Sequence, residues 1–212
     1  MKYGCVIFDL DGVIVSTDNC HYLAWKRMAD EEGIYFDRTI NERLRGVSRM
    51  ESLEIILSGS SKTFTDAEKE RLATEKNDRY RKLLAQMSPA DMPTAVRDAL
   101  TALHNAGLKL AVGSSSKNAA YILERLDANR YFDAVCDGTM IAHSKPDPEV
   151  FTKAAAMVGL APADCLVVED AAAGLEAARA GGMDCAIVGT APMPFEPTYH
   201  MQDVTKLPGT IL

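Results

Sequence analysis

Short apolar runs alternate with amphipathic segments along much of the chain. We expect buried β-strands at five apolar runs: residues 5–8, 108–113, 134–136, 165–168 and 185–188. We expect helices at four intervening segments: residues 94–106, 119–126, 148–158 and 171–180. Pro148 fits the first turn of its helix, and Gly159 and Gly181 lie where helices are expected to end. This alternation predicts βαβ units and an α/β fold with a doubly wound, Rossmann-like parallel sheet.

Residues 17–86 interrupt this alternation. They contain helical patterns rich in Glu, Lys, Arg and Leu, and no convincing strand. The segment follows the first predicted strand and precedes the second, and loops at the carboxyl edge of a parallel sheet accept such insertions. We therefore expect an α/β catalytic core domain formed by residues 1–15 and 88–212, with residues 16–87 inserted as a helical cap domain.

The composition narrows the class of protein. The 212 residues are 47% hydrophobic and 25% charged, and 30 acidic against 23 basic residues leave a net charge of −7. This balance argues against a general nucleic-acid-binding protein, which needs clustered Lys and Arg. No apolar run approaches the roughly 18 residues that span a bilayer, and Asp9 comes too early for a signal peptide. We expect a cytoplasmic protein that binds neither nucleic acid nor membrane.

The cysteines show no pattern that indicates chemistry. None of the five belongs to a CxxC pair or to another metal-ligand spacing. Cys5, Cys165 and Cys185 lie in or beside apolar runs, where a reduced cysteine serves as a small hydrophobic residue. We expect these three to be reduced and buried.

The first predicted strand leads into two carboxylates, Asp9 and Asp11. An extended chain points residues i and i+2 to one side, and Gly12 lets the chain turn sharply after them. Two acids at the end of a buried strand are costly unless a cation lies between them. The alternative is that both are solvated loop residues.

A second pair of carboxylates, Glu169 and Asp170, ends a later strand. Parallel strands bring both pairs to the same edge of the sheet, and clustered hard oxygen ligands suit Mg²⁺. The alternative is that Asp170 caps the helix expected from about residue 171.

Two more strand ends carry polar groups that could bind an anion. Residues 114–118, Ser-Ser-Ser-Lys-Asn, lead from a strand into a helix and offer hydroxyl and backbone N–H donors. Lys145 lies in a stiff loop before Pro146, where it could neutralise a phosphoryl group in transfer. The alternatives are ordinary helix capping by Ser or Asn and a solvated lysine.

These four elements, in this order, resemble the haloacid dehalogenase superfamily: Asp9-Leu10-Asp11-Gly12, Ser114, Lys145-Pro146 and Glu169-Asp170. Within it, the chain resembles the β-phosphoglucomutase family over essentially its whole length. That second resemblance rests on more specific motifs: His21-x-x-x-Trp25, Arg45-Gly46-Val47-Ser48-Arg49, Lys76-Asn77-Asp78 and Ser114-x-Ser116-Lys117-Asn118.

The resemblance implies an enzyme that forms an aspartyl phosphate. Asp9 would be the nucleophile, and Asp11 the general acid and base for the sugar oxygens. The implied ligands of Mg²⁺ are Asp9, the Asp11 carbonyl, Glu169 and Asp170. Ser114 and Lys145 would hold the transferring phosphoryl group. Thr17 and His21 would help to place Asp11, the sugar would contact Trp25, Gly46, Val47, Ser52 and Lys76, and the other phosphate would contact Arg49, Ser116 and Asn118.

The resemblance also implies the ligands, which are small sugar phosphates. The enzyme, expected to be a monomer, would interconvert β-glucose 1-phosphate and glucose 6-phosphate through β-glucose 1,6-bisphosphate. One alternative is a sugar-phosphate phosphatase of the same fold, which would release phosphate as its main product. Another is a silent sugar-phosphate sensor, which would have no need of the intact Asp9 and Asp11 pair.

Several of these residues also have ordinary structural explanations. Trp25 and Val47 could be core residues of the helical segment, His21 a surface histidine, and Arg49 a solvated charge. Ser16 departs from the family, which usually has Asp at this hinge position. The three remaining histidines match no motif and are expected to be structural or exposed: His104, His143 and His200.

Overall fold

The computed structural model describes all 212 residues, and they form two compact units. Residues 1–16 and 87–212 make up the first, which we call the core unit. Residues 17–86 make up the second, which we call the helical unit. None of the helices is both long and apolar enough to cross a lipid bilayer.

The core unit is built on a parallel sheet of six strands in the order β3-β2-β1-β4-β5-β6. The strands are β1 (Cys5–Phe8), β2 (Lys109–Gly113), β3 (Ala134–Cys136), β4 (Cys165–Glu169), β5 (Asp184–Val188) and β6 (Tyr199–Met201). The predicted α/β fold is therefore confirmed, and the five predicted strands are all present. The strand order reverses at β1, between β2 and β4, which is where open α/β sheets bind ligands.

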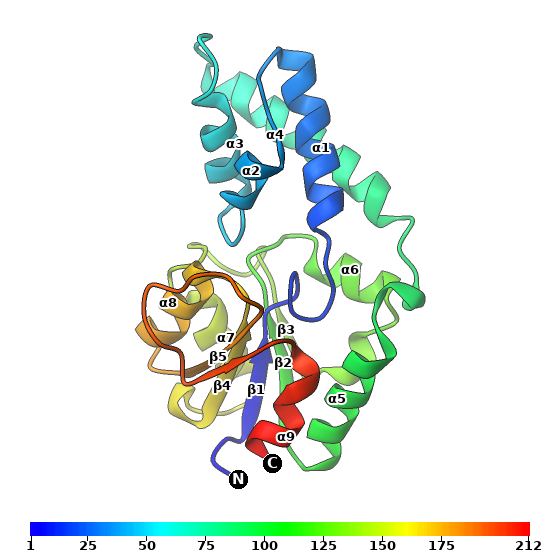
Figure 1. Cartoon of the computed structure of the whole chain (residues 1–212), viewed down its shortest axis with the longest axis vertical. Coiled ribbons are helices and arrows are strands. Elements are labelled where there is room, and N and C mark those ends of the chain that lie inside the picture. The colour runs from blue at the N-terminus through cyan, green and yellow to red at the C-terminus, as the bar shows by residue number, and fades with distance from the viewer. The chain divides into compact units, whose positions relative to one another are not determined.

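Helices cover both faces of this sheet. They are α5 (Thr94–Asn105), α6 (Ala119–Arg125), α7 (Glu149–Met157), α8 (Ala172–Ala180) and α9 (Leu207–Ile211). Figure 1 shows α7 and α8 on one side of the sheet and α5 and α9 on the other. Short 3₁₀ turns occur at Pro89–Asp91, Asn129–Tyr131, Pro162–Asp164 and Val204–Lys206. Pro148 is the residue before α7 and not part of its first turn, a small correction to the prediction.

Alternation along the strands produces the core on the side of α7 and α8. Ile7, Val167 and Ile187 from three neighbouring strands pack there with Phe151 of α7 and Leu175 of α8. Every second residue of a strand faces the same side, so the even-numbered neighbours face α5 and α9. All five cysteines are free, and Cys5, Cys165 and Cys185 are buried in this core, as predicted: they act as small apolar residues.

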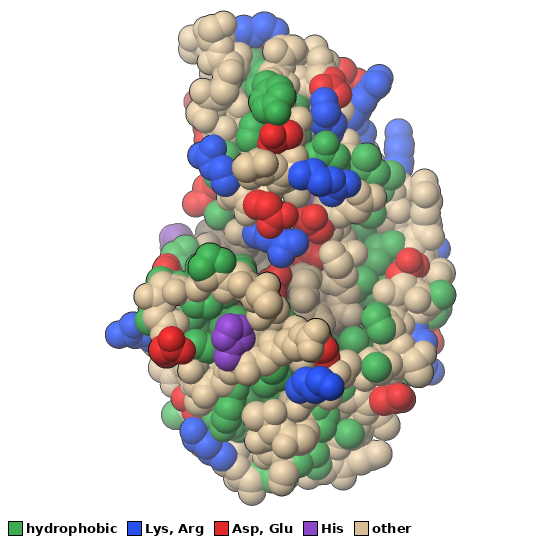
Figure 2. Space-filling view, viewed as in Figure 1, with side chains coloured by type: hydrophobic (Ala, Val, Ile, Leu, Met, Phe, Trp, Pro, Cys, Tyr) green, Lys and Arg blue, Asp and Glu red, His purple; other side chains and the backbone are tan.

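The helical unit contains four helices and no strand, as its sequence indicates. They are α1 (Asp18–Glu32), α2 (Arg38–Glu42), α3 (Arg49–Leu57) and α4 (Asp66–Leu84). Capping boxes at Ser48 and Thr65 fix the first turns of α3 and α4. Apolar residues such as Met28, Leu53 and Leu72 form the core of this unit. On the face drawn in Figure 2, basic and acidic side chains lie interspersed.

Candidate active site

The loop after β1 carries the first pair of acids at the centre of the sheet. The N–H of Asp9 donates to the Val168 carbonyl at 2.9 Å, so Asp9 continues the pairing of β1 with β4. Its side chain is buried, as expected for a group that follows a central strand. Gly12 has φ of 85°, which favours glycine, and its N–H donates to the Val15 carbonyl at 2.8 Å. This turn holds Asp11 in the loop that leaves the strand.

Lys145 joins acids from two neighbouring strands. Its Nζ atom lies 2.5 Å from Asp9 Oδ1 and 2.6 Å from Glu169 Oε1. Only 3% of Lys145 is exposed, and its ammonium group lies 4.5 Å from the centroid of the Phe151 ring. The alternative of a solvated lysine is therefore wrong. A buried ammonium ion between two carboxylates provides the positive charge that a phosphoryl group would need.

Burial and these neighbours shift the pKa values of both groups. Burial raises the pKa of Asp9 to about 7, with Lys145 opposing the shift and Glu169 adding to it. Burial works against the charged form of Lys145, but Asp9 and Glu169 outweigh it and raise the pKa of Lys145. Lys145 is therefore charged, and Asp9 holds a proton more readily than an ordinary aspartate, a tendency that additional positive charge would oppose.

Glu169 is fully engaged by hydrogen-bond donors. Its Oε1 accepts from Lys145, and its Oε2 accepts from the N–H groups of Asp170 at 2.8 Å and Ala171 at 2.9 Å. The N-cap of α8 is Ala171 and not Asp170, so the alternative of Asp170 as the N-cap of this helix is wrong.

Two glycines make room for the carboxylates of the second pair. A Cβ atom on Gly174 would lie 2.0 Å from Glu169 Oε1, and one on Gly12 would lie 2.1 Å from Asp170 Oδ2. Asp170 therefore lies directly against the loop that carries Asp9 and Asp11. This set of hard oxygen donors fits a divalent cation such as Mg²⁺.

The loop after β2 is held by its own hydroxyl groups. Ser114 Oγ accepts from the N–H of Ser116, and Ser116 Oγ accepts from the N–H of Asn118, both at 3.2 Å. Ser115 Oγ accepts from the N–H of Lys145 at 3.3 Å, which links this loop to the loop after β3. Asn118 precedes α6 without a side-chain capping bond, so capping does not explain it. The structure thus brings Ser114 and Lys145 to the same edge of the sheet.

The loop after β3 also leaves no spare room beside the Ser114 loop. The N–H of Gly138 donates to the Ser116 carbonyl at 3.2 Å. A Cβ atom on Gly138 would lie 2.3 Å from the Ser115 carbonyl oxygen. Gly138 therefore permits a close approach of two backbones, and its role was not predicted from the sequence.

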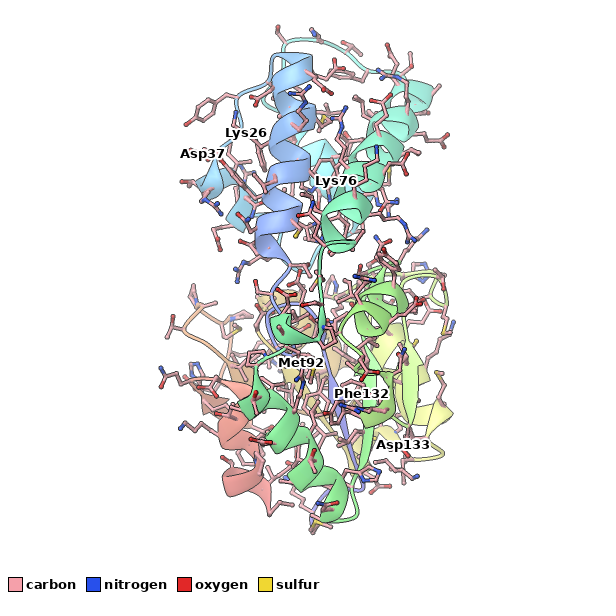
Figure 3. The ribbon with its side chains drawn as sticks, turned by 90° about the vertical axis from the view of Figure 1, so that its right-hand side faces the viewer. Lys26, Asp37, Lys76, Met92, Phe132 and Asp133 are labelled. Atoms are coloured by element: carbon pink, nitrogen blue, oxygen red, sulfur yellow. The ribbon has the colours of Figure 1, made fainter.

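In the helical unit, four predicted residues form one cluster with a tyrosine that was not predicted. Lys76 Nζ lies 2.9 Å from His21 Nδ1 and over the rings of Trp25, at 4.4 Å, and Tyr80, at 4.7 Å. Thr17 and Tyr80 share a hydrogen bond of 2.8 Å between their hydroxyl groups. Figure 3 shows Lys76 on α4, on the side toward α1. Tyr80 lies four residues after Lys76, a helical spacing that could have indicated it.

The contacts of His21 define its protonation. An ammonium group can only donate, so His21 Nδ1 accepts from Lys76 and the ring proton is on Nε2. Burial, Lys76 and Arg49 lower the pKa of His21 well below its usual value. His21 is thus a neutral donor within a cluster, and the alternative of a solvated surface histidine is wrong.

The other predicted residues of the helical unit lie around the start of α3. Gly46 has φ of 73° in the turn before this helix, and Val47 beside it is half-buried. Arg49 is the first residue of α3, and burial lowers its pKa, while Asp78 and Tyr80 oppose that shift. Arg49 is therefore not a fully solvated charge. Ser52 is buried one turn further along the helix.

Trp25 is 1% exposed and belongs to the apolar core of the helical unit. The explanation of Trp25 as a core residue therefore holds, alongside its contact with Lys76. Both explanations of Trp25 were open from the sequence, because an aromatic residue at helical spacing looks the same in both cases.

Comparison with known proteins agrees with this arrangement. A family model of haloacid dehalogenase-like hydrolases matches residues 3–182 of the chain. The chain therefore belongs to the haloacid dehalogenase-like hydrolase family. It is 46% identical over 186 residues to the β-phosphoglucomutase of Bacillus subtilis (strain 168). That alignment covers 87% of this chain and 82% of the Bacillus protein.

Two further similarities mark the range of activities among its relatives. The chain is 31% identical over 182 residues to the phosphorylated carbohydrates phosphatase of Thermotoga maritima, covering 84% of this chain and 82% of that protein. The crystal structure of a β-phosphoglucomutase from Clostridium difficile matches with a TM-score of 0.90 and 34% identity. That match covers 97% of this chain and 93% of the other. The family resemblance of the motifs is thus confirmed.

Proposed function

We propose that this protein is a β-phosphoglucomutase that interconverts β-D-glucose 1-phosphate and D-glucose 6-phosphate through β-D-glucose 1,6-bisphosphate. The observation that carries this proposal is the buried contact of Lys145 with both Asp9 and Glu169 at the switch point of the sheet. It supports phosphoryl transfer to a carboxylate, and the 46% identity to a β-phosphoglucomutase supports the sugar substrate.

In the proposed reaction, Asp9 attacks phosphorus and the bond between phosphorus and the sugar oxygen breaks. Asp11 gives a proton to the departing sugar oxygen, and in the reverse step it takes one from the attacking hydroxyl group. Lys145 and Ser114 hold the phosphoryl oxygens. Mg²⁺, held by Asp9, the Asp11 carbonyl, Glu169 and Asp170, would neutralise negative charge on the transferring group.

The two half-reactions restore the phosphorylated enzyme. The 6-hydroxyl of β-glucose 1-phosphate first takes the phosphoryl group from Asp9 to form the bisphosphate. Asp9 then takes the phosphoryl group from the 1-position, and glucose 6-phosphate leaves. Each phosphate of the intermediate in turn occupies the transfer site, so the other needs an anion site of its own, for which we propose Arg49, Ser116 and Asn118.

The helical unit supplies the remaining groups in this proposal. Trp25, Gly46, Val47, Ser52 and Lys76 contact the sugar, and Thr17 and His21 help to place Asp11. We propose that the helical unit acts as a cap that excludes water, because a mutase must transfer to a hydroxyl group and not to water. That the protein is a cytoplasmic monomer stays a prediction.

A sugar-phosphate phosphatase is the second candidate, because the chain is also 31% identical to a phosphorylated carbohydrates phosphatase. The deciding experiment supplies β-glucose 1-phosphate, Mg²⁺ and a trace of bisphosphate, and follows glucose 6-phosphate and free phosphate together. A mutase produces glucose 6-phosphate with little free phosphate. Free phosphate as the main product would overturn the proposal in favour of the phosphatase.

A further inference from the structure

We propose that Tyr80 is a positioning residue that holds Thr17 and His21 in place for transfer to the sugar. The kinetic consequence of this inference rests on the proposed function, but the contacts of Tyr80 do not depend on it. Tyr80 lies on α4, while Thr17 and His21 lie at the start of α1. None of the sequence motifs includes Tyr80.

The hydroxyl group of Tyr80 ties together two distant parts of the chain. Its partner, Thr17 Oγ1, is 63 residues earlier in the sequence and 2.8 Å away, and both side chains are 1% exposed. Thr17 is the first residue of the helical unit, and Tyr80 is on the last helix before the chain leaves it. One buried hydrogen bond therefore fixes the entering and leaving segments of this unit against each other.

The ring of Tyr80 supports the neighbouring functional groups. Its centroid lies 4.0 Å from that of His21, with 32° between the planes, and 4.7 Å from the ammonium group of Lys76. Lys76 in turn donates to His21. The ring and the Lys76 ammonium group therefore confine the imidazole from two directions. A side chain that fixes both Thr17 and the plane of His21 controls where the Nε2–H donor of His21 points.

If Thr17 and His21 are held less firmly, only transfer to the sugar oxygen should slow, because in the proposed function only that step needs the helical unit. Removing the hydroxyl group of Tyr80 while keeping its ring frees Thr17 without emptying the core. Transfer to the sugar oxygen should then slow about two- to tenfold in kcat, the usual effect of one hydrogen bond. Phosphorylation of Asp9 by a small acyl phosphate, which has no sugar, should not change.

The experiment compares Tyr80→Phe with Tyr22→Phe. Tyr22 lies on α1 of the same unit with its ring stacked on Phe36, so its substitution controls for the loss of a tyrosine hydroxyl group. Tyr80→Phe should lower kcat for β-glucose 1-phosphate and leave small-donor hydrolysis unchanged, while Tyr22→Phe should change neither. An equal fall in both activities of Tyr80→Phe would make Tyr80 a purely structural residue and overturn the proposal, as would no fall in either.

A double-mutant cycle with Thr17→Val tests the contact without relying on the proposed function. Because the two hydroxyl groups are partners, the losses of stability in Tyr80→Phe and Thr17→Val should be clearly non-additive. The Nε2–H signal of His21 in the NMR spectrum should also shift in Tyr80→Leu, which lacks the ring. Additive losses, or an unchanged signal in a folded Tyr80→Leu, would overturn the proposal. If the wild-type enzyme has no mutase activity, the proposed function fails, and the cycle still decides whether Tyr80 holds Thr17 in place.

Discussion

Gly174 lies directly against the carboxylate of Glu169, so that a Cβ atom at position 174 would come within 2.0 Å of both Cδ and Oε1 of Glu169. Such a contact is impossible without movement of one of the two elements. Glu169 Oε1 is the atom that accepts from Lys145, and Lys145 also contacts Asp9. Because residue 174 has no side chain, the Glu169 carboxylate can lie where it holds the Lys145 ammonium group beside Asp9.

Gly174→Ala should move the Glu169 carboxylate and with it Lys145. A displacement of about 1 Å can cost on the order of a hundredfold in rate, and we expect a loss of that order in kcat. The control is Gly209→Ala in α9, where a Cβ atom meets nothing within 4 Å. Because alanine favours helix over glycine, the control should be neutral or slightly stabilising. Equal kcat values for the two variants would contradict this role of Gly174.

Asp9→Asn should abolish turnover and leave the fold intact, because an amide is not a usable nucleophile. The aspartyl phosphate, detected by mass spectrometry after reaction with a small donor, should be absent as well. Asp98→Asn, at an exposed position on α5, is the matched control and should behave as the wild type. A tenth of the wild-type activity in pure, folded Asp9→Asn would remove Asp9 from the role of nucleophile.

Removal of Mg²⁺ with a chelator should stop turnover, and added Mg²⁺ should restore it. In the absence of substrate, Mg²⁺ should raise the melting temperature, because it binds the folded state. Asp170→Asn should weaken this stabilisation, because an amide is a poorer ligand for Mg²⁺ than a carboxylate. Unchanged turnover in excess EDTA would contradict the dependence on Mg²⁺, and an unchanged effect of Mg²⁺ on the melting temperature of Asp170→Asn would contradict Asp170 as a ligand.

The sequence predicted the sheet well, because the five predicted strands are largely apolar runs, and three of them lead directly into the polar motifs at Asp9, Ser114 and Glu169. The strand β6 was not predicted, since it has three residues and one of them, His200, is exposed. Gly174 and Gly138 were not predicted, because each is required only by the lack of room beside another group, Glu169 for Gly174 and the Ser115 carbonyl oxygen for Gly138. A pattern of residue types does not show how closely such a group approaches.

The pKa shift of His21 predicts a dependence of stability on pH. The folded protein keeps His21 neutral, while the unfolded chain takes up a proton below its ordinary pKa of 6.5. Folding therefore becomes less favourable as the pH falls below 6.5, and His21 alone should cost up to about 1.4 kcal/mol between pH 7.5 and pH 5.5.

Urea unfolding of His21→Gln at both pH values measures this contribution, because glutamine does not titrate. The loss of stability between pH 7.5 and pH 5.5 should be smaller in His21→Gln than in the wild type. His143→Gln is the control, since the side chain of His143 is 73% exposed. The same pH dependence in His21→Gln and the wild type would show that folding does not lower the pKa of His21, which would contradict the prediction.

Arg49→Ala should separate transfer to the sugar from the chemistry at Asp9. Arg49 begins α3 in the helical unit, and burial lowers its pKa, so its guanidinium group is partly withdrawn from water without being a residue of the apolar core. In the proposed function it binds the phosphate that is not being transferred. Losing one charge-assisted contact to a phosphate should cost about 1.5–3 kcal/mol, or roughly one to two orders of magnitude in affinity.

The division of that loss between kcat and KM shows how the enzyme uses the binding energy of Arg49 for the phosphate. If binding at Arg49 also helps to exclude water, part of the loss appears in kcat as well as in KM. Phosphorylation of Asp9 by a small donor should be nearly unaffected, because that donor has no second phosphate. Arg27→Ala, which removes an exposed arginine of α1, is the matched control and should change neither activity. A parallel fall of both activities in Arg49→Ala would mean that Arg49 supports the fold, and no fall in either would mean that Arg49 does not bind the phosphate.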